Sequence, residues 1–456
     1  MSEGSKAVLE LPVVLILGGT TTMARPLARY LLAGPCRLAA FVRIADRFSV
    51  NPPTTYLDKP FRTLLNDTSV PLEYRQVNLS NVETHKDTLR PPSVWNEEPV
   101  NWETFNVIYD LTGDIGFDKP ELIQISHTYK LALGLARSAA ALPKPPRAYI
   151  RLTFCFYEMK SSIGHTESAD LRPDGIRGRW WHETLRALGT VHGLNVAVIR
   201  CAAWYGYGTW EGQVLPRVVV GHVYQYLNQE MKFLYNSDLR IHTIHTDDIA
   251  QGLHLAANYV ATTPRETVIL QSSVELPFSF QASSGSSTFS LSTKRTSLSD
   301  TWKTVDTVVP EKVKVTIPLF NVVDDNDSTQ DTLAKAVAGV WGIKYGFINS
   351  AIAVLVQQFA KKDFSEMVDD VNENHVEAWS KMLAASDPPI ISTPITPFLD
   401  EHAFRKMAIC LDGSKAKRVL GFKPTRPRVE VDELKRIVKG FQDDGLWCVT
   451  ACILEM

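Results

Sequence analysis

The chain has 456 residues, 45% of them hydrophobic, and its 48 basic side chains almost balance its 50 acidic ones. Such a balance argues against a strongly basic surface, so nucleic acid is not an expected partner. Apolar runs fall short of the about 20 residues that span a membrane, and the amino-terminal residues lack the pattern of a secretory signal. The six cysteines are scattered, as in reduced intracellular proteins. We therefore expect a cytoplasmic protein without a membrane span.

The most informative motif is segment 13–32, where an apolar run passes through a turn of small residues into a helical pattern. Nucleotide-binding α/β domains begin in this way, although an ordinary strand-to-helix turn can look the same. Gly18 ends the strand, because glycine adopts backbone angles that other residues resist. Ala24 and Thr21 stand where further glycines are usual. Ala24 is still small, whereas Thr21 puts a branched side chain where a pyrophosphate needs bare backbone.

Short apolar segments then alternate with helical patterns. The expected strands after the first are 38–42, 72–78, 107–111, 148–154 and 196–200, and the expected helices include 121–141 and 178–192. This alternation predicts an α/β protein with a Rossmann-type doubly wound parallel sheet, whose ligands lie at the carboxyl ends of the strands.

Later segments continue the pattern with one interruption. Residues 241–250 are expected to form a strand that leads into a helix capped by Asp247 or Asp248. The Ser/Thr-rich stretch 276–306 lacks a core-forming pattern and is predicted to be an exposed, mobile insertion whose deletion leaves the fold intact. A buried strand at 316–323 and a helix at 331–341 follow it.

Four motifs in order carry a family resemblance: residues 18–24, 198–206, 244–250 and 414–424. Together they resemble the extended short-chain dehydrogenases/reductases, the NAD(P)-dependent epimerase/dehydratase group. The resemblance implies a Rossmann domain over 10–205, to which 236–260 returns. It also implies a smaller C-terminal α/β substrate lobe, built from 206–235 and 261–450.

The resemblance also implies a cofactor. In such domains an acidic residue after the second strand holds the ribose of NAD, whereas an arginine there pairs with the extra phosphate of NADP. The predicted second strand ends at Arg43, with Arg47 nearby, so NADP is expected. Asp46 leaves NAD as an alternative, and Arg43 as a solvated strand-end charge is another. The cofactor contacts that the resemblance implies are Gly18, Thr20, Thr21, Met23, Ala24, Arg43, Asn78, Leu79, Thr112 and Cys201.

The catalytic motif departs from the family pattern. Family members use a Ser/Thr after the fifth strand and a Tyr-x-x-x-Lys on the next helix. Thr153 matches the first position, and Tyr157 follows four residues later. Alignment on Glu183 puts Gly175 at the tyrosine and Arg179 at the lysine. Glycine cannot relay a proton.

Three interpretations remain open for this helix and its neighbours. Arg179 keeps a positive charge but stays protonated, so it can bind cofactor without acting as a base. Tyr157 can serve as the proton donor, with Thr153 and Arg179 assisting. Alternatively, residues 180–182 line a pocket, and the dinucleotide is bound without turnover. The plainer structural interpretation is that the two tryptophans pack in the core while His182 and Glu183 face solvent. His182 is the one group on that helix that titrates near neutral pH.

Aromatic residues follow the sixth strand, and they favour a flat or apolar substrate. These residues are Trp204, Tyr205, Tyr207 and Trp210. We therefore expect an NAD(P)-dependent oxidoreductase or epimerase/dehydratase that acts on a small organic molecule. The alternative is a catalytically silent dinucleotide-binding sensor or scaffold, which the missing tyrosine favours. A homodimer is compatible with either. His242 and His245 lack a third ligand, so no metal site is expected.

Overall fold

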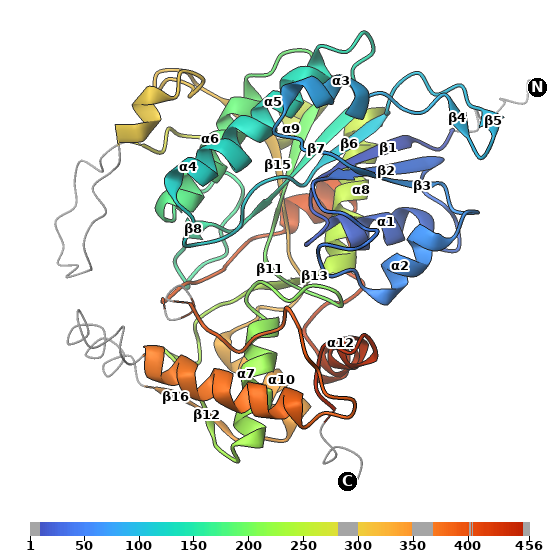
Figure 1. Cartoon of the computed structure of the whole chain (residues 1–456). Helices are drawn as coiled ribbons and strands as arrows, with labels where there is room; N and C mark the ends of the chain where they lie inside the picture. Colours follow the sequence, from blue (N-terminus) through green and yellow to red (C-terminus); the bar gives the residue numbers. More distant parts are fainter. Residues whose placement is uncertain (1–9, 281–299, 349–367, 401–402, 404, 450–456) are drawn as a thin grey trace, which may run out of the picture.

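Eight strands form one sheet in the order β14-β15-β10-β7-β6-β1-β2-β3, and β14 alone runs antiparallel to its neighbour (Figure 1). The computed structural model describes residues 10–280, 300–348, 368–400, 403 and 405–449. The strands of the sheet are β1 (Val13–Leu17), β2 (Phe41–Asp46), β3 (Leu72–Gln76), β6 (Val107–Asp110), β7 (Ala148–Phe154), β10 (Val196–Cys201), β14 (Ser273–Glu275) and β15 (Thr316–Val322). The predicted α/β class and the doubly wound parallel sheet are confirmed.

Helices cover both faces of the sheet. On one face lie α1 (Ala24–Leu32), α2 (Lys59–Asn66) and α8 (Thr246–Thr262), and on the other lie α4 (Glu121–Gln124), the π-helical η2 (Ile125–Lys130), α5 (Leu131–Ala140) and α6 (Gly175–Gly189). A hydrophobic core lies on each face of the sheet. From β7, Ile150 and Leu152 pack into one core and Tyr149 packs into the other. Because the central strands are buried on both faces, they are mostly apolar, and charged residues within them such as Arg151 and Asp110 are buried as a pair.

A smaller lobe lies beyond the carboxyl ends of the strands (Figure 1). Its elements are α7 (Leu215–Tyr226), the paired strands β12 (Met231–Leu234) and β16 (Tyr345–Ile348), α10 (Gln330–Trp341), a helix over 368–384 and α12 (Val431–Asp443). Its core contains His222, whose ring stacks on Trp341 at 3.9 Å and whose Nδ1 accepts a hydrogen bond from Trp447 at 2.9 Å. Burial lowers the pKa of His222 to about 3, so the imidazole is a neutral packing group.

Short elements connect these parts. They are η1 (Val82–Thr84), α3 (His85–Thr88), β4 (Val94–Trp95), β5 (Glu98–Pro99), β8 (Tyr157–Glu158), β9 (Arg172–Pro173), β11 (Ala203–Tyr205), β13 (Thr243–His245), α9 (Arg265–Ser272), η3 (Asp300–Thr304) and η5 (Ala416–Leu420). Among the described residues, no helix is both long and apolar enough to cross a bilayer.

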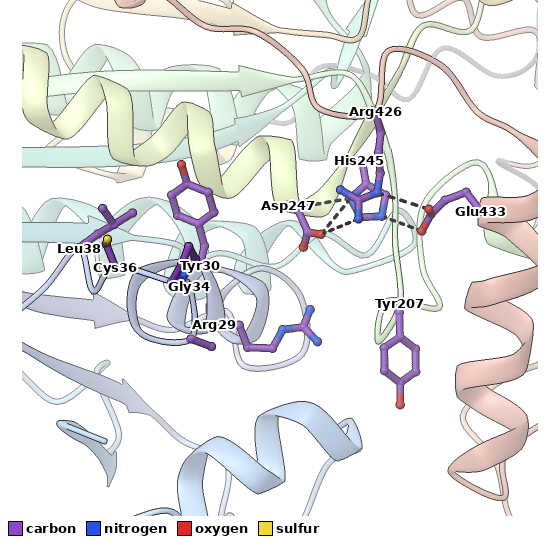
Figure 2. Close-up of a pocket in the computed structure, with 12 residues that line it drawn as sticks. Arg29, Tyr30, Gly34, Cys36, Leu38, Tyr207, His245, Asp247, Arg426 and Glu433 are labelled. Atoms are coloured by element: carbon purple, nitrogen blue, oxygen red, sulfur yellow. Dashed lines mark hydrogen bonds and ion pairs between the residues drawn. The ribbon is translucent and has the colours of Figure 1, made fainter. Parts of the chain in front are cut away.

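Several predicted boundaries are wrong. The second strand ends at Asp46 and not at 42 or 43. Strands β14 and β15, which belong to the predicted substrate lobe 261–450, complete the Rossmann sheet instead. Helix α8 is capped by His245, whose Nδ1 accepts the amide hydrogen of Asp247 at 3.1 Å (Figure 2). Asp248 accepts hydrogen bonds from the backbone of residues 425 and 426.

The predicted insertion 276–306 is only partly an insertion. Its residues 281–299 lie outside the described part of the chain, but the flanks pack on α6. The ring of Trp302 stacks on Phe280 at 5.4 Å, and Phe280 is buried. Arg186 donates hydrogen bonds to backbone carbonyls on both sides of the segment. Deleting the whole stretch would therefore remove core residues.

Candidate dinucleotide site

The turn after β1 is packed tightly on the end of β6. Gly18 and Gly19 have φ angles of +68° and +76°, a region that favours glycine. A Cβ on Gly19 would lie 2.7 Å from Cβ of Leu111, and one on Gly18 would lie 2.9 Å from Cγ2 of Thr112. Both glycines are therefore required by packing, whether or not a ligand is bound. Thr112 serves as a wall of this turn.

Backbone donors remain available at the start of α1. The amides of Thr22 and Ala24 both donate to the carbonyl of Gly19 at 2.9 Å. Within the described chain, no hydrogen-bond partner is seen for the amides of Thr21 and Met23; Thr21 is partly exposed, whereas Met23 is buried. Free amides at a helix start are the donors that bind a phosphate.

Asp46 is the acidic residue at the end of β2. Its carboxylate accepts the amide hydrogens of Thr20 at 2.9 Å and of Arg47 at 2.7 Å. The carboxylate is thereby fixed beside the turn, at the strand end where a ribose hydroxyl is held in such domains.

Arg43 lies three residues before the strand end, and its predicted position there is wrong. The side chain is buried, and Nε donates to Glu73 at 2.8 Å. Nη1 donates to the carbonyls of Thr88 at 3.2 Å and Arg90 at 2.6 Å. Because these bonds hold the guanidinium inside the protein, Arg43 supports the strand. It does not face the crevice outside the carboxyl ends of the strands, where this class of fold binds its ligands.

Arg25, which the sequence analysis did not single out, ties the turn to the smaller lobe. Its fully buried guanidinium donates to Asp58 at 2.5 Å, to the carbonyl of Gly208 at 2.5 Å and to the carbonyl of Thr20 at 2.7 Å. Glu211 follows in the same loop, and its pKa is raised by burial and by the charge of Asp114. The crevice therefore carries an acidic group on the lobe side.

Helix α6 presents Trp181 to the loop after β6. A Cβ on Gly113 would lie 2.6 Å from Cζ2 of this ring, and the indole Nε1 donates to the carbonyl of Asp114 at 3.0 Å. Arg177, one turn earlier, donates to the carbonyl of Ile115 at 2.7 Å. The residues that approach this loop are thus Arg177 and Trp181, not the predicted pair Gly175 and Arg179.

Arg179 lies on another side of α6. Its pKa is lowered by burial and by the charge of Arg172, and it interacts with Glu158. Gly175 is the first residue of the helix and has open space beside it. Neither residue supplies a group to the crevice.

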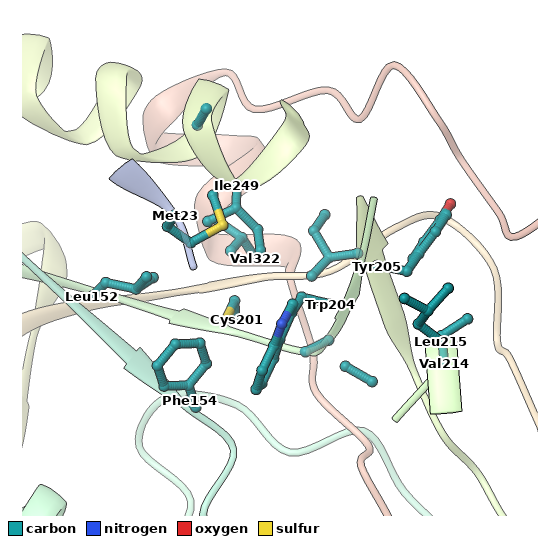
Figure 3. Close-up of a cluster of buried hydrophobic side chains, with 14 of the residues drawn as sticks. Met23, Leu152, Phe154, Cys201, Trp204, Tyr205, Val214, Leu215, Ile249 and Val322 are labelled. Atoms are coloured by element: carbon teal, nitrogen blue, oxygen red, sulfur yellow. The ribbon is translucent and has the colours of Figure 1, made fainter. Parts of the chain in front are cut away.

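Aromatic side chains fill the space beside Trp181 at the carboxyl ends of β7 and β10. Its ring centroid lies 5.5 Å from that of Phe154 and 5.4 Å from that of Phe156, and Phe154 lies 4.5 Å from Trp204. Cys201 is buried in the same cluster, which Figure 3 shows between Phe154 and Trp204. Cys201 is thus a core residue.

The buried guanidinium of Arg151 packs against the ring of Trp181. Arg151 lies 5.0 Å from the ring, and its Nη1 donates to Asp110 at 2.6 Å and to Thr112 at 3.0 Å. Both charged side chains are fully buried. Because a buried charge is costly without its partner, this pair holds Arg151 and the indole above it in place.

Tyr157 and Thr153 lie beyond this cluster. The Tyr157 hydroxyl is 3.2 Å from Nδ1 of His182, whose Nε2 is 2.7 Å from the carbonyl of Pro277. Nε2 therefore donates to the carbonyl, and Nδ1 accepts a hydrogen bond from the Tyr157 hydroxyl. Burial raises the pKa of Tyr157 and lowers that of His182. Thr153, near the end of β7, is buried and pairs in register with Arg200.

The remaining predicted residues differ in exposure. Leu79 is buried, whereas Asn78 is exposed and accepts the amide hydrogen of Ser80 at 3.1 Å. His242 bridges the Leu411 backbone and Asp327 and is structural. In the part of the chain that the structure describes, no three His, Cys, Asp or Glu side chains form a metal-binding group.

Solved structures define the class of fold. The dTDP-glucose 4,6-dehydratase DesIV from Streptomyces venezuelae, with NAD and TYD bound, has a TM-score of 0.55 at 15% identity, over 95% of this chain and 98% of its own. UDP-N-acetylglucosamine 4-epimerase from Bacillus cereus has a TM-score of 0.53 at 12% identity, over 96% and 99%. UDP-glucose 4-epimerase from Thermotoga maritima has a TM-score of 0.53 at 12% identity, over 94% and 99%.

The chain therefore has the fold of these dehydratase and epimerase structures, which is the fold that the resemblance implied. At these identities the likeness is one of fold. No protein-family model matches the sequence, and the search of curated proteins gives no match.

The two ends of the crevice differ in their fit to a dinucleotide. The end built by Asp46 and the free amides of Thr21 and Met23 suits an adenosine diphosphate group. The other end does not suit a nicotinamide, because Trp181 lies on Gly113. No step through a bound nicotinamide follows from this arrangement.

Proposed function

We propose that this protein binds the adenosine diphosphate part of NAD and works as a nucleotide-dependent sensor or scaffold without hydride transfer. The observation that carries the proposal is the contact between Trp181 and Gly113. A large ring, backed by the buried Arg151, lies on the loop where a redox cofactor would need space. On the face of α6 that approaches this loop, Arg177 and Trp181 stand in place of a side chain that could relay a proton.

We further propose that NAD is preferred over NADP. The reason for expecting NADP was Arg43 at the strand end, but Asp46 occupies that end. A carboxylate accepts hydrogen bonds from ribose hydroxyls and repels a phosphate at the same place. Arg47 follows Asp46 in the sequence and is exposed. The measured ratio of NAD to NADP affinity therefore shows which of these two side chains determines the cofactor preference.

Calorimetric titration tests this binding site. We expect Asp46→Asn to weaken NAD binding about tenfold, since an amide bonds ribose less strongly than a carboxylate does. Asp67→Asn is the matched control, because Asp67 is exposed at a turn distant in sequence. Equal NAD affinity in wild type and Asp46→Asn, or tighter binding of NADP than of NAD, would contradict the proposal.

An oxidoreductase or epimerase/dehydratase acting on a small apolar or aromatic molecule is the second candidate. The buried pair of Tyr157 and His182 favours it, because a hydroxyl bonded to an imidazole can pass a proton. Its test is oxidation of NADH or NADPH with a panel of ketones, enones and aldehydes. Turnover that Tyr157→Phe lowers by about two to four orders of magnitude would support the second candidate.

A further inference from the structure

A second cavity lies away from the crevice, between the end of α1, the start of α8 and the loop before α12 (Figure 2). Its volume is about 630 Å³, within the range of small-molecule sites. The lining residues that matter chemically are Arg29, Tyr30, Tyr207, Asp247, Arg426 and Glu433. None of them belongs to the turn after β1, so the cavity is separate from the proposed nucleotide site, although Arg29 shares the Asp58 carboxylate with Arg25.

Arg29 gives the cavity an uncompensated positive charge. Its Nη1 lies 3.1 Å from Asp58, but the same carboxylate binds Arg25 at 2.5 Å. One carboxylate is thus shared between two guanidinium groups, which leaves a net charge of about +1. The Arg29 side chain is partly exposed, so its remaining N–H groups can reach a ligand.

Arg426 supplies a second, loosely held guanidinium. Its ion pairs with Asp247 and Glu433 both measure 3.4 Å, longer than a strong charge-assisted hydrogen bond. Asp247 is 40% exposed, so its carboxylate also faces the open side. Asp247 and Glu433 offset part of the attraction that the two arginines exert on an anion.

Two tyrosine rings provide the apolar walls. The hydroxyl of Tyr207 donates to Asp444 at 2.6 Å, which fixes the ring at the cavity edge. Tyr30 lies on α1 next to Arg29, with its ring centroid 5.9 Å from that of His254. In Figure 2, Arg29 points toward the space between Asp247 and Tyr207, and the Tyr30 ring lies on the opposite side of Asp247 from Tyr207. Such rings bind a flat aromatic group by stacking or edge contacts.

We propose that this cavity binds a small planar aromatic monoanion, an aromatic carboxylate. The carboxylate would pair with the guanidinium of Arg29, whose planar fork matches its geometry, and Arg426 would add charge. The aromatic body would lie against Tyr30 and Tyr207. A phosphate ester fits less well, because its second negative charge would face Asp247 and Glu433.

The test uses 2-naphthoate as the probe and the full chain without added nucleotide. Calorimetric titration and saturation-transfer NMR should detect saturable binding to the wild type. Arg29→Gln should weaken it about tenfold, the usual effect of losing one charge-assisted contact. Arg426→Gln is a second variant in case the first folds poorly. Arg172→Gln, at a surface ion pair remote from the cavity lining, is the control and should bind like the wild type.

The neutral 2-naphthamide distinguishes charge recognition from apolar binding, and it should bind about tenfold more weakly than 2-naphthoate. Three results would overturn the proposal: no saturable binding of 2-naphthoate to the wild type up to about 10 mM, equal affinity for acid and amide, or unchanged affinity in folded Arg29→Gln and Arg426→Gln. Failure of NAD to bind would leave these results unaffected, so the two proposals are tested separately.

Discussion

The indole of Trp181 lies so close to Gly113 that a Cβ on residue 113 would come within 2.6 Å of the ring. The two residues lie on α6 and after β6, and neither is informative alone. Together they bring a large side chain onto the loop at the carboxyl end of β6, where a dinucleotide of this fold class would place its redox half.

The contact between Gly113 and Trp181 predicts a stability effect. Gly113 has a φ angle of +126°, so Gly113→Ala should lower the free energy of unfolding by about 2–4 kcal/mol through strain and overlap. Urea unfolding of Gly113→Ala, Trp181→Leu and the double variant measures the coupling between the two sites. Because the added methyl group and the indole ring overlap, the double variant should lose less free energy of unfolding than the two single variants lose together. Additive losses would contradict the contact.

Arg43 is predicted to act on stability and not on cofactor choice. Arg43→Ala removes the bonds to Glu73 and to the backbone carbonyls of Thr88 and Arg90, which should cost about 2–3 kcal/mol. The ratio of NAD to NADP affinity should stay unchanged. Arg47→Ala, beside it and exposed, is the control for stability. A changed affinity ratio in folded Arg43→Ala would refute this assignment.

Glu211 is predicted to oppose nucleotide binding. Burial and the charge of Asp114 raise the pKa of Glu211, while Arg25 opposes the rise; when ionised, this carboxylate puts a negative charge near the crevice. Glu211→Gln removes that charge and should tighten ADP binding about threefold. Glu230→Gln in the smaller lobe, where Glu230 pairs with Lys232, serves as the control. Weaker ADP binding in Glu211→Gln would argue against this location of the pyrophosphate.

Asp324 is predicted to make stability depend on pH. Burial raises its pKa to about 7 in the folded protein, above the usual value of about 4. The folded state therefore holds the proton more strongly, and this stabilisation is present at low pH and lost as the pH rises from about 4 to about 7.

Asp324→Asn cannot titrate at this position. Relative to wild type, its free energy of unfolding should rise by about 2–3 kcal/mol between pH of about 5 and about 8. Asp443→Asn, at an exposed ion pair with Lys439, is the control. Parallel pH profiles for wild type and Asp324→Asn would disprove the shift.

Local patterns predicted the sheet, whereas contacts between distant residues decided the site. The strand 148–154 was predicted at its observed bounds, because all its residues except Arg151 are apolar or have high β-propensity. Arg43 was misplaced, since a strand shifted by about three residues ends at a different side chain. The pairings of Trp181 with Gly113 and of Tyr157 with His182 come from tertiary packing, which no local spacing encodes. In the sequence, only the departure from the Tyr-x-x-x-Lys motif indicated that this helix differs from the family pattern near Trp181.

The most direct test of the account compares the affinities of ADP and NAD by calorimetric titration under one set of conditions. If the protein retains the adenosine diphosphate end and lacks the redox end, NAD should bind no more than about threefold tighter than ADP. Trp181→Ala should then widen the gap in favour of NAD, because it opens the space at Gly113. Wild-type affinity for NAD that exceeds the affinity for ADP by about a hundredfold would contradict the central claim.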